Sequence, residues 1–237
     1  MTTFPEMLKS YLNESILGRA IASEKLQVNC HNIRDYTQDK HNRTDDIPYG
    51  GGNGMVMTAQ PIDSCFEEIV TQVGQKPYFI YMSPQGKTLT QSKALELSKK
   101  ENLVILCGHY EGVDQRVLDK LCDEEISIGD YVITGGELPA LVLVDSVARM
   151  LDGVLKNEDC FTNESHFSGL LEHPQYTRPA VWQGREVPSV LMSGHHKNIE
   201  KYQREQSLLN TFNKRPELLE TAELTKNDQD FIQKLQN

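Results

Sequence analysis

The sequence predicts an α/β fold built around a largely parallel sheet. Between residues 78 and 151, short apolar runs alternate with segments of helical periodicity. Each apolar run is followed by a loop that contains glycine, and helical patterns come between the runs. This order is typical of parallel sheets, because a parallel strand needs a crossover connection before the next one.

The individual elements follow from the apolar runs and from the residues that interrupt them. A continuous apolar run of about five residues is typical of a strand that is buried on both faces, and proline or glycine ends such a run. Lys99 and Lys100 suit the carboxyl end of a helix. These patterns predict strands at residues 78–82, 103–107 and 130–133, and helices at residues 91–100 and 137–152.

The predicted helix at residues 137–152 has apolar side chains around nearly its whole circumference. Such a helix must be buried on all sides, so we expect it either inside the domain or at the interface of a homodimer. Further helices are predicted at residues 193–219 and 225–237. The chain is therefore expected to consist of an α/β domain (1–156), a polar linker (157–168) and a small all-helical domain (169–237).

Composition favours a globular protein of the cytoplasm. Hydrophobic residues make up 38% of the 237 residues, and no apolar run approaches the roughly 18 residues that span a bilayer. The N-terminus lacks the basic and apolar regions of a secretory signal. The five cysteines include no Cys-x-x-Cys pair, which argues against a disulfide framework and a zinc ribbon.

The net charge of −10 opposes binding to nucleic acid, because contacts to phosphate come from lysine and arginine. An acidic protein still binds RNA where its basic residues gather on one face. Residues 193–219 hold a modest excess of basic side chains, at Lys197, Lys201, Arg204, Lys214 and Arg215.

Three glycine-containing loops follow strand ends, at residues 83–86, 108–112 and 134–137. Ligands of open α/β sheets bind outside the carboxyl ends of the strands. The loops therefore either line one pocket together or serve only as turns. None of them has the spacing of a P-loop or of a dinucleotide-binding loop, so the common phosphate-binding motifs are absent from the sequence.

A fourth loop, at residues 49–55, has four glycines in the five positions from Gly50 to Gly54. A tight turn needs fewer glycines than this. Two interpretations stay open at this stage: the segment wraps a flat ligand, or it is a flexible loop.

Several charged residues have both a structural and a functional interpretation. Arg149 follows Asp145 by four residues, so it either forms an ion pair within the helix or serves a site. Glu164 and Glu172 lie near the end of the linker. Each is either a solvated carboxylate or a candidate general base. His195 starts a helical pattern, and capping or RNA contact fits it better than metal binding, because no third ligand is suitably spaced. No metal site is predicted.

The sequence also resembles the bacterial tRNA (guanine-N1)-methyltransferases. The similarity runs in order from about Phe4 to Leu219. Many long motifs in register are far more specific than any single glycine pattern. The motifs are found at residues 48–55, 83–86, 107–112, 127–139, 169–179, 191–195 and 215–219.

The resemblance implies a trefoil-knotted α/β domain of the SPOUT type, with the knot at about residues 81–140, that binds S-adenosylmethionine in a bent form. It implies a homodimer whose active sites draw on both subunits, and a helical C-terminal domain that helps to bind tRNA. The implied reaction methylates N1 of the guanosine at tRNA position 37 when position 36 is also guanosine. Activity in the family is also supported by Mg²⁺, whose ligands the sequence does not indicate.

The resemblance also assigns roles to residues by their place in the motifs. Arg149 would stabilise the guanine as it loses its proton, and counting back from Gly169 puts Glu164 at the position of the general base, which is usually an aspartate. The residues implied for substrate binding are Asn53, Gly54, Ser165 and His195. The residues implied for cofactor binding are Tyr81, Met82, Ser83, Pro84, Gly108, Tyr110, Glu111, Gly112, Ile128, Gly129, Tyr131, Ile133, Gly135, Gly136 and Pro139.

The implied chemistry needs no covalent protein nucleophile, in agreement with the lack of a convincing Cys-His or Ser-His pair in the sequence. A carboxylate takes the N1 proton while an arginine offsets the charge that grows on O6. Two alternatives remain: a knotted methyltransferase that acts on ribosomal RNA or another tRNA position, and a non-catalytic RNA-binding module that keeps the pocket.

Overall fold

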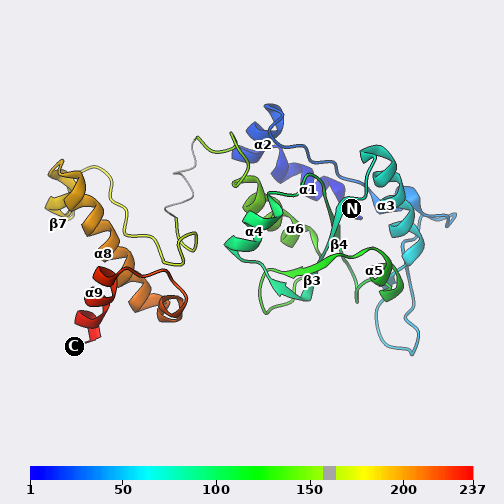
Figure 1. Cartoon of the computed structure of the whole chain (residues 1–237). Coiled ribbons are helices and arrows are strands. Elements are labelled where there is room, and N and C mark those ends of the chain that lie inside the picture. Colours follow the sequence, from blue (N-terminus) through cyan, green and yellow to red (C-terminus); the bar gives the residue numbers. More distant parts are fainter. Residues whose placement is uncertain (157–163, 237) are drawn as a thin grey trace. The chain divides into compact units, whose positions relative to one another are not determined.

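A computed structural model describes residues 1–156 and 164–236 of the chain (Figure 1). The chain divides into two compact units, Met1–Lys156 and Asn157–Asn237. Residues 157–163 of the predicted linker lie outside the described residues, and residues 164–168 belong to the second unit. No helix in the described ranges is long and apolar enough to cross a membrane.

The first unit contains a three-stranded parallel sheet with strand order β4-β3-β5. Its strands are β3 (Tyr78–Thr88), β4 (Leu103–Cys107) and β5 (Glu124–Ser127). The prediction of an α/β fold with a parallel sheet is confirmed, and β4 has the bounds that the sequence predicted.

The third predicted strand is wrong. Residues 130–133 do not pair with the sheet, and Tyr131 and Val132 are exposed by 55% and 82%. The strand lies earlier, at β5, where Glu124 and Glu125 interrupt the apolar pattern. Apolar and aromatic residues indicate a strand only where a sheet surface buries them, and the chain after β5 turns away from the sheet.

Strand β3 is also longer than predicted, because residues 83–86 do not end it. Ile126 of β5 pairs with Met82 and again with Lys87, so the intervening residues form a bulge within β3. Pro84 cannot donate to a strand ladder. At Gly86 a Cβ atom would lie 2.4 Å from the carbonyl carbon of Glu125, so glycine is needed where the backbone returns to β5.

Helices cover both faces of the sheet (Figure 1). Successive residues of a strand face opposite sides. Phe79 and Tyr81 therefore pack with α3 (Ala59–Val73) and α5 (Gln115–Leu121), which lie side by side. Ile80 and Met82 pack on the other side with α4 (Gln91–Leu97) and α6 (Glu137–Ala148). Both α4 and α6 end earlier than predicted.

The N-terminal backbone extends the sheet beyond β4. The Met1 amine donates to the Ile105 carbonyl oxygen at 2.9 Å, and the Cys107 amide donates to the Met1 carbonyl at 3.0 Å. Thr2 forms a parallel bridge with Asn32 on its other side. Beside Met1, between β4 and residues 25–31, lies a cavity of about 780 Å³ with mainly apolar walls. The helices α1 (Pro5–Leu12) and α2 (Ser15–Ala22) follow.

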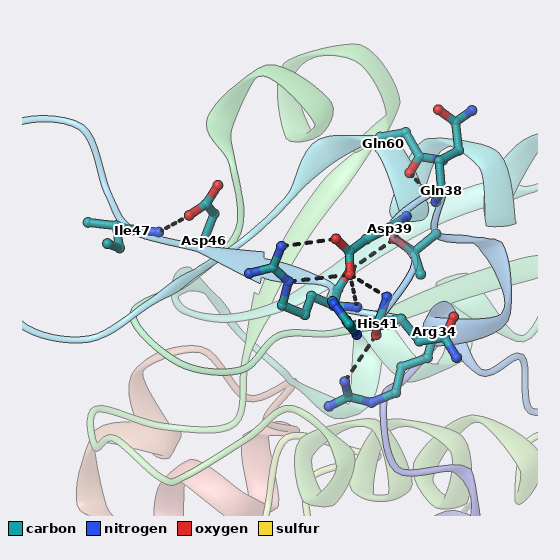
Figure 2. A network of polar contacts seen from close by, with 10 residues as sticks. Arg34, Gln38, Asp39, His41, Asp46, Ile47 and Gln60 are labelled. Atoms are coloured by element: carbon teal, nitrogen blue, oxygen red, sulfur yellow. Dashed lines mark hydrogen bonds and ion pairs between the residues drawn. The ribbon is translucent and has the colours of Figure 1, made fainter.

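A polar network shapes the segment that leads to the glycine-rich loop. Figure 2 shows Asp39, whose carboxylate accepts hydrogen bonds from the backbone amide of His41 and from the amide and guanidinium of Arg43. These bonds hold the pKa of Asp39 below its usual value. Gln60 accepts from the amide of Gln38 and so fixes the segment to α3. The nearby short elements are η1 (Ile33–Tyr36), β1 (Asp45–Asp46) and β2 (Val56–Met57).

The second unit is mainly helical, but the prediction that it is all-helical is wrong. It contains a hairpin of β6 (Val181–Trp182) and β7 (Arg185–Glu186). The two turn residues, Gln183 and Gly184, both have positive φ, as a tight two-residue hairpin requires. The remaining elements are η2 (Ser189–Met192), α8 (His196–Lys214), η3 (Pro216–Glu220) and α9 (Lys226–Gln236).

An ion pair joins α8 to α9. The Arg204 guanidinium donates to both carboxylate oxygens of Asp228, at 3.1 and 3.0 Å. Asp228 also accepts from the hydroxyl and the backbone amide of Thr225, and it is 4% exposed. One buried carboxylate thus fixes the start of the last helix to the middle of α8.

Candidate active site

A cavity of about 450 Å³ opens at the carboxyl ends of the strands, where ligands of parallel sheets bind. Its walls come from the bulge in β3, the loop at residues 108–112 after β4, and residues 128–136 between β5 and α6. All fifteen residues implied for cofactor binding line this one cavity. The three loops thus line a shared pocket and are not merely turns.

Glycines let two of these loops approach each other closely. The Gly136 amide donates to the Gly108 carbonyl at 2.8 Å, and a Cβ atom on Gly136 would lie 2.6 Å from the Cα of Cys107. A Cβ atom on Gly108 would lie 2.8 Å from the Tyr81 ring. Larger residues would therefore force the walls apart, so the glycines set the width of the cavity.

The charged side chains of the cavity wall include two glutamates and no lysine or arginine among the described lining residues. The glutamates are Glu111 and Glu125. Burial raises the pKa of Tyr81 to about 12, so its phenol stays protonated near neutral pH. Such walls suit a ligand with a net positive charge, and they do not suit a polyphosphate, which binds cations or helix N-termini.

The loop after β4 holds a strained residue at the cavity. Tyr110 has φ of 59° and is 47% exposed. A side chain other than glycine in this region costs about 1–2 kcal/mol, and such strain gathers at functional sites. The loop is held by the Glu111 amide, which donates to the Met55 carbonyl at 2.9 Å, and by the Met57 amide, which donates to the Gly112 carbonyl at 2.9 Å.

The hydrogen bonds between residues 55–57 and residues 111–112 also bring the glycine-rich loop to the cavity. A Cβ atom on Gly54 would lie 2.6 Å from the Glu111 side chain, and the φ of +90° at Gly54 favours glycine there. Glu111 is itself a lining residue. Of the four residues implied for substrate binding, the structure brings Gly54, with Asn53 beside it in the chain, to the edge of the cavity.

Arg149 does not line this cavity. It caps the carboxyl end of α6, whereas the cavity is at the other end, by Gly135, Gly136 and Pro139. The helix has 12 residues, which corresponds to a length of about 18 Å. Within this chain, the helix therefore separates Arg149 from the cavity.

The outer side of α6 and α1 exposes a group of large apolar side chains, which we name the α1–α6 face. Its members are each 45% to 52% exposed, and the Tyr11 hydroxyl donates to Asp145 of α6 at 3.4 Å. Contiguous apolar patches on a protein surface mark interaction sites. The face consists of Phe4, Met7, Tyr11, Leu138 and Val142.

Comparison with known proteins shows the family of the chain. The family described as tRNA (Guanine-1)-methyltransferase TrmD matches residues 1–221. The chain belongs to this family. A relative from Ruminiclostridium cellulolyticum is 58% identical over 218 residues, which cover 92% of this chain and 94% of the relative. Another relative, from Alkaliphilus oremlandii, is 53% identical over a match that covers 100% of this chain and 97% of the relative. Both are named tRNA (guanine-N(1)-)-methyltransferase.

The tRNA (guanine-1)-methyltransferase family was the one that the sequence motifs indicated, and that prediction is confirmed. In this member the other implied site residues lie in the second unit. The Glu172 amide donates to the Ser165 hydroxyl at 2.9 Å, and His195 is exposed immediately before α8. Glu164 is half-buried. Within the described ranges, no three His, Cys, Asp or Glu side chains converge as a metal site.

One pair of side chains in this methyltransferase family member was not predicted from the sequence. His109 lines the cavity, and its Nε2 lies 2.6 Å from the carboxylate of Glu137, which is 1% exposed. The Thr2 hydroxyl donates to the same carboxylate at 2.5 Å. Glu137 begins a mainly apolar helix. An ionisable residue at this position was the feature of the sequence that could have indicated a buried polar contact. The pair fixes the loop at residues 108–112 to the start of α6.

Proposed function

We propose that the protein transfers the methyl group of S-adenosylmethionine to N1 of the guanosine at tRNA position 37, in tRNAs with guanosine at position 36. The observation that carries this proposal is one cavity at the strand ends that all fifteen implied residues line, with no lysine or arginine among its lining residues in the described ranges. Membership of the family supplies the reaction type.

The residues of the cavity fit the proposed cofactor. Its sulfonium and ammonium groups outweigh its one carboxylate, so Glu111 and Glu125 complement its charge. Glycine at positions 108 and 136 lets the walls of the cavity pack closely against Tyr81 and against the end of β4. Tyr81 and Tyr110 offer aromatic surface, and backbone groups of the three loops offer hydrogen bonds. When bound, the cofactor supplies an electrophilic methyl group.

Two side chains carry the proposed proton chemistry. The carboxylate of Glu164 takes the proton from guanine N1, and the guanidinium of Arg149 offsets the negative charge that develops on O6. With its N1 proton removed and the charge on O6 offset by these two side chains, the guanine would be able to accept the methyl group that the bound cofactor would supply. The target base must leave its stack to enter the cavity, where Gly54 and Asn53 lie at the edge.

We further propose a homodimer joined through the α1–α6 face. The face would bury the exposed side chains of Leu138 and Val142, whose apolar surface otherwise stays in water. Arg149 of one protomer would then serve the cavity of the other, since α6 separates the two within a single chain. This arrangement explains why α6 is apolar around nearly its whole circumference.

The remaining assignments complete the proposal. The domain at residues 1–156 is a trefoil-knotted cofactor-binding domain, residues 157–168 are a linker, and residues 169–237 form a tRNA-binding domain that uses Ser165 and His195 at its start. Magnesium would support the activity, as in the family that the motifs indicate, with ligands that remain to be identified. The protein would act in the cytoplasm.

A single-turnover assay tests the proposal with two transcripts that differ only at position 36. The transcript with guanosine at both positions should be methylated, and the other should react far more slowly. Glu164→Gln should slow the reaction by about 10²- to 10⁴-fold, the usual contribution of a general base. The matched control is Glu172→Gln, which changes the neighbouring candidate carboxylate and should keep most of the activity. Equal rates on both transcripts would contradict the proposed specificity.

A further inference from the structure

The hairpin formed by β6 and β7 is an ordered element that buries almost nothing. Every residue from Gln175 to Glu186 is exposed. Trp182 and Val181 are exposed by 58% and 53%. Two ladder pairs hold the hairpin, and the Val187 amide extends it by donating to the Ala180 carbonyl at 2.9 Å. Such a defined segment with a large aromatic side chain in water is typical of a recognition surface.

The two faces of the hairpin differ in chemistry. Trp182 lies directly opposite Arg185 in the ladder, and Val181 lies opposite Glu186. Residues that are opposite each other project from the same face, with Cβ atoms about 4.5–5.5 Å apart. One face therefore presents an indole ring next to a guanidinium, and the other presents an isopropyl group next to a carboxylate.

The surrounding sequence is basic, although the chain as a whole is acidic. Residues 173–204 contain five lysines and arginines, two glutamates and three histidines, in a chain with a net charge of −10. Arg178 lies in the exposed segment just before the hairpin. A local positive charge combined with an exposed aromatic ring is the combination that binds unpaired nucleic acid, by contacts to phosphate and by stacking.

We propose that the face with Trp182 and Arg185 binds an unpaired nucleotide of the RNA substrate. The indole ring stacks on the base, and the guanidinium contacts the adjoining phosphate. This inference rests on the proposed function, because it takes tRNA as the partner. It adds a contact made by residues that are not among those lining the cavity and that take no part in the methyl transfer itself. A protein partner would fit less well, because the flanking charge is positive and stacking needs no shaped pocket.

Trp182 is the only tryptophan of the chain, so its fluorescence reports on this face alone. Titration of the full-length protein with an unmodified tRNA transcript should change the intensity of Trp182 emission, with the same midpoint as binding measured by filter retention. Adding salt should reverse the change, since phosphate contacts weaken with ionic strength.

Variants separate stacking from general damage to the hairpin. Trp182→Ala should weaken tRNA binding about tenfold, whereas Trp182→Phe should keep most of the affinity, because phenylalanine also stacks on a base. Arg185→Ala should weaken binding and lower its salt dependence. Val181→Ala is the matched control on the opposite face and should leave the affinity unchanged.

The outcomes distinguish this inference from the proposed function. If the protein methylates tRNA while emission stays constant and Trp182→Ala binds like wild type, the inference is overturned and the proposed function stands. If emission changes with protein concentration in the absence of RNA, a second copy covers the face, and the inference is again overturned. If the protein neither binds nor methylates tRNA, the proposed function itself fails.

Discussion

The contact between Gly136 and the end of β4 offers a sharp test of how the cavity is built. At Gly136 the backbone has φ of −82° and ψ of −6°, which alanine adopts without strain. The effect of Gly136→Ala is therefore purely steric. The new Cβ atom would lie 2.6 Å from the Cα of Cys107 and 2.7 Å from the Gly108 nitrogen, so the two loops must separate by about 0.8 Å to reach 3.4 Å.

Both contacting atoms belong to the backbone, so no flexible side chain can move aside. Overpacking of this kind costs about 1–3 kcal/mol of stability, and a displacement of about 1 Å in a catalytic site costs about 100-fold in rate. We expect Gly136→Ala to weaken binding of S-adenosylhomocysteine at least tenfold by isothermal titration calorimetry, and to slow methyl transfer by about 100-fold.

The control is Gly74→Ala, at the carboxyl end of α3. Gly74 has φ of +79°, and a Cβ atom there would have no heavy atom within 4 Å, so alanine costs about 1–2 kcal/mol through backbone strain alone. This variant should lose stability in a denaturant titration and yet bind the cofactor like wild type. Wild-type affinity in Gly136→Ala would refute the reasoning.

Two further predictions concern stability. Burial opposes ionisation of Asp228, but the hydrogen bonds from Arg204 and Thr225 and the charge of Arg204 together outweigh it and lower its pKa. Asp228→Asn should therefore destabilise the protein at pH 7. The difference in unfolding free energy between this variant and the wild type should shrink as the pH falls below about 4. A difference that does not change with pH would contradict this prediction. Burial and the nearby N-terminal ammonium lower the pKa of His31. The protein should therefore lose stability as the pH falls below about 6.5. The His31→Asn variant should lose less stability than the wild type when thermal melts at pH 7.5 and 5.5 are compared.

Much of the site could be predicted because it depends on glycine and on motif order. Glycine at positions such as Gly108 and Gly136 is required by close backbone contacts, and such a requirement leaves a clear mark in the sequence. The family motifs then assigned the surrounding residues, and these line one cavity. The role of that cavity in binding the cofactor stays a prediction.

Other features could not be predicted because tertiary contacts decide them. The strand β5 contains Glu124 and Glu125, and only its pairing with β3 makes it a strand. Tyr131 and Val132 have strand-like side chains but lie outside the sheet. The position of Glu137 at the start of a mainly apolar helix was a signal, but its partner His109 lies 28 positions away, so no local pattern reveals that the two side chains meet.

The most direct measurement of the central claim is the position and number of methyl groups that the protein adds to tRNA. An unmodified transcript with guanosines at positions 36 and 37 is incubated with the protein and S-adenosylmethionine carrying a deuterated methyl group, and nuclease fragments are then analysed by mass spectrometry. We expect one labelled methyl group for each tRNA, on N1 of guanosine 37. A label at any other nucleotide, or no label at stoichiometric protein, would contradict it.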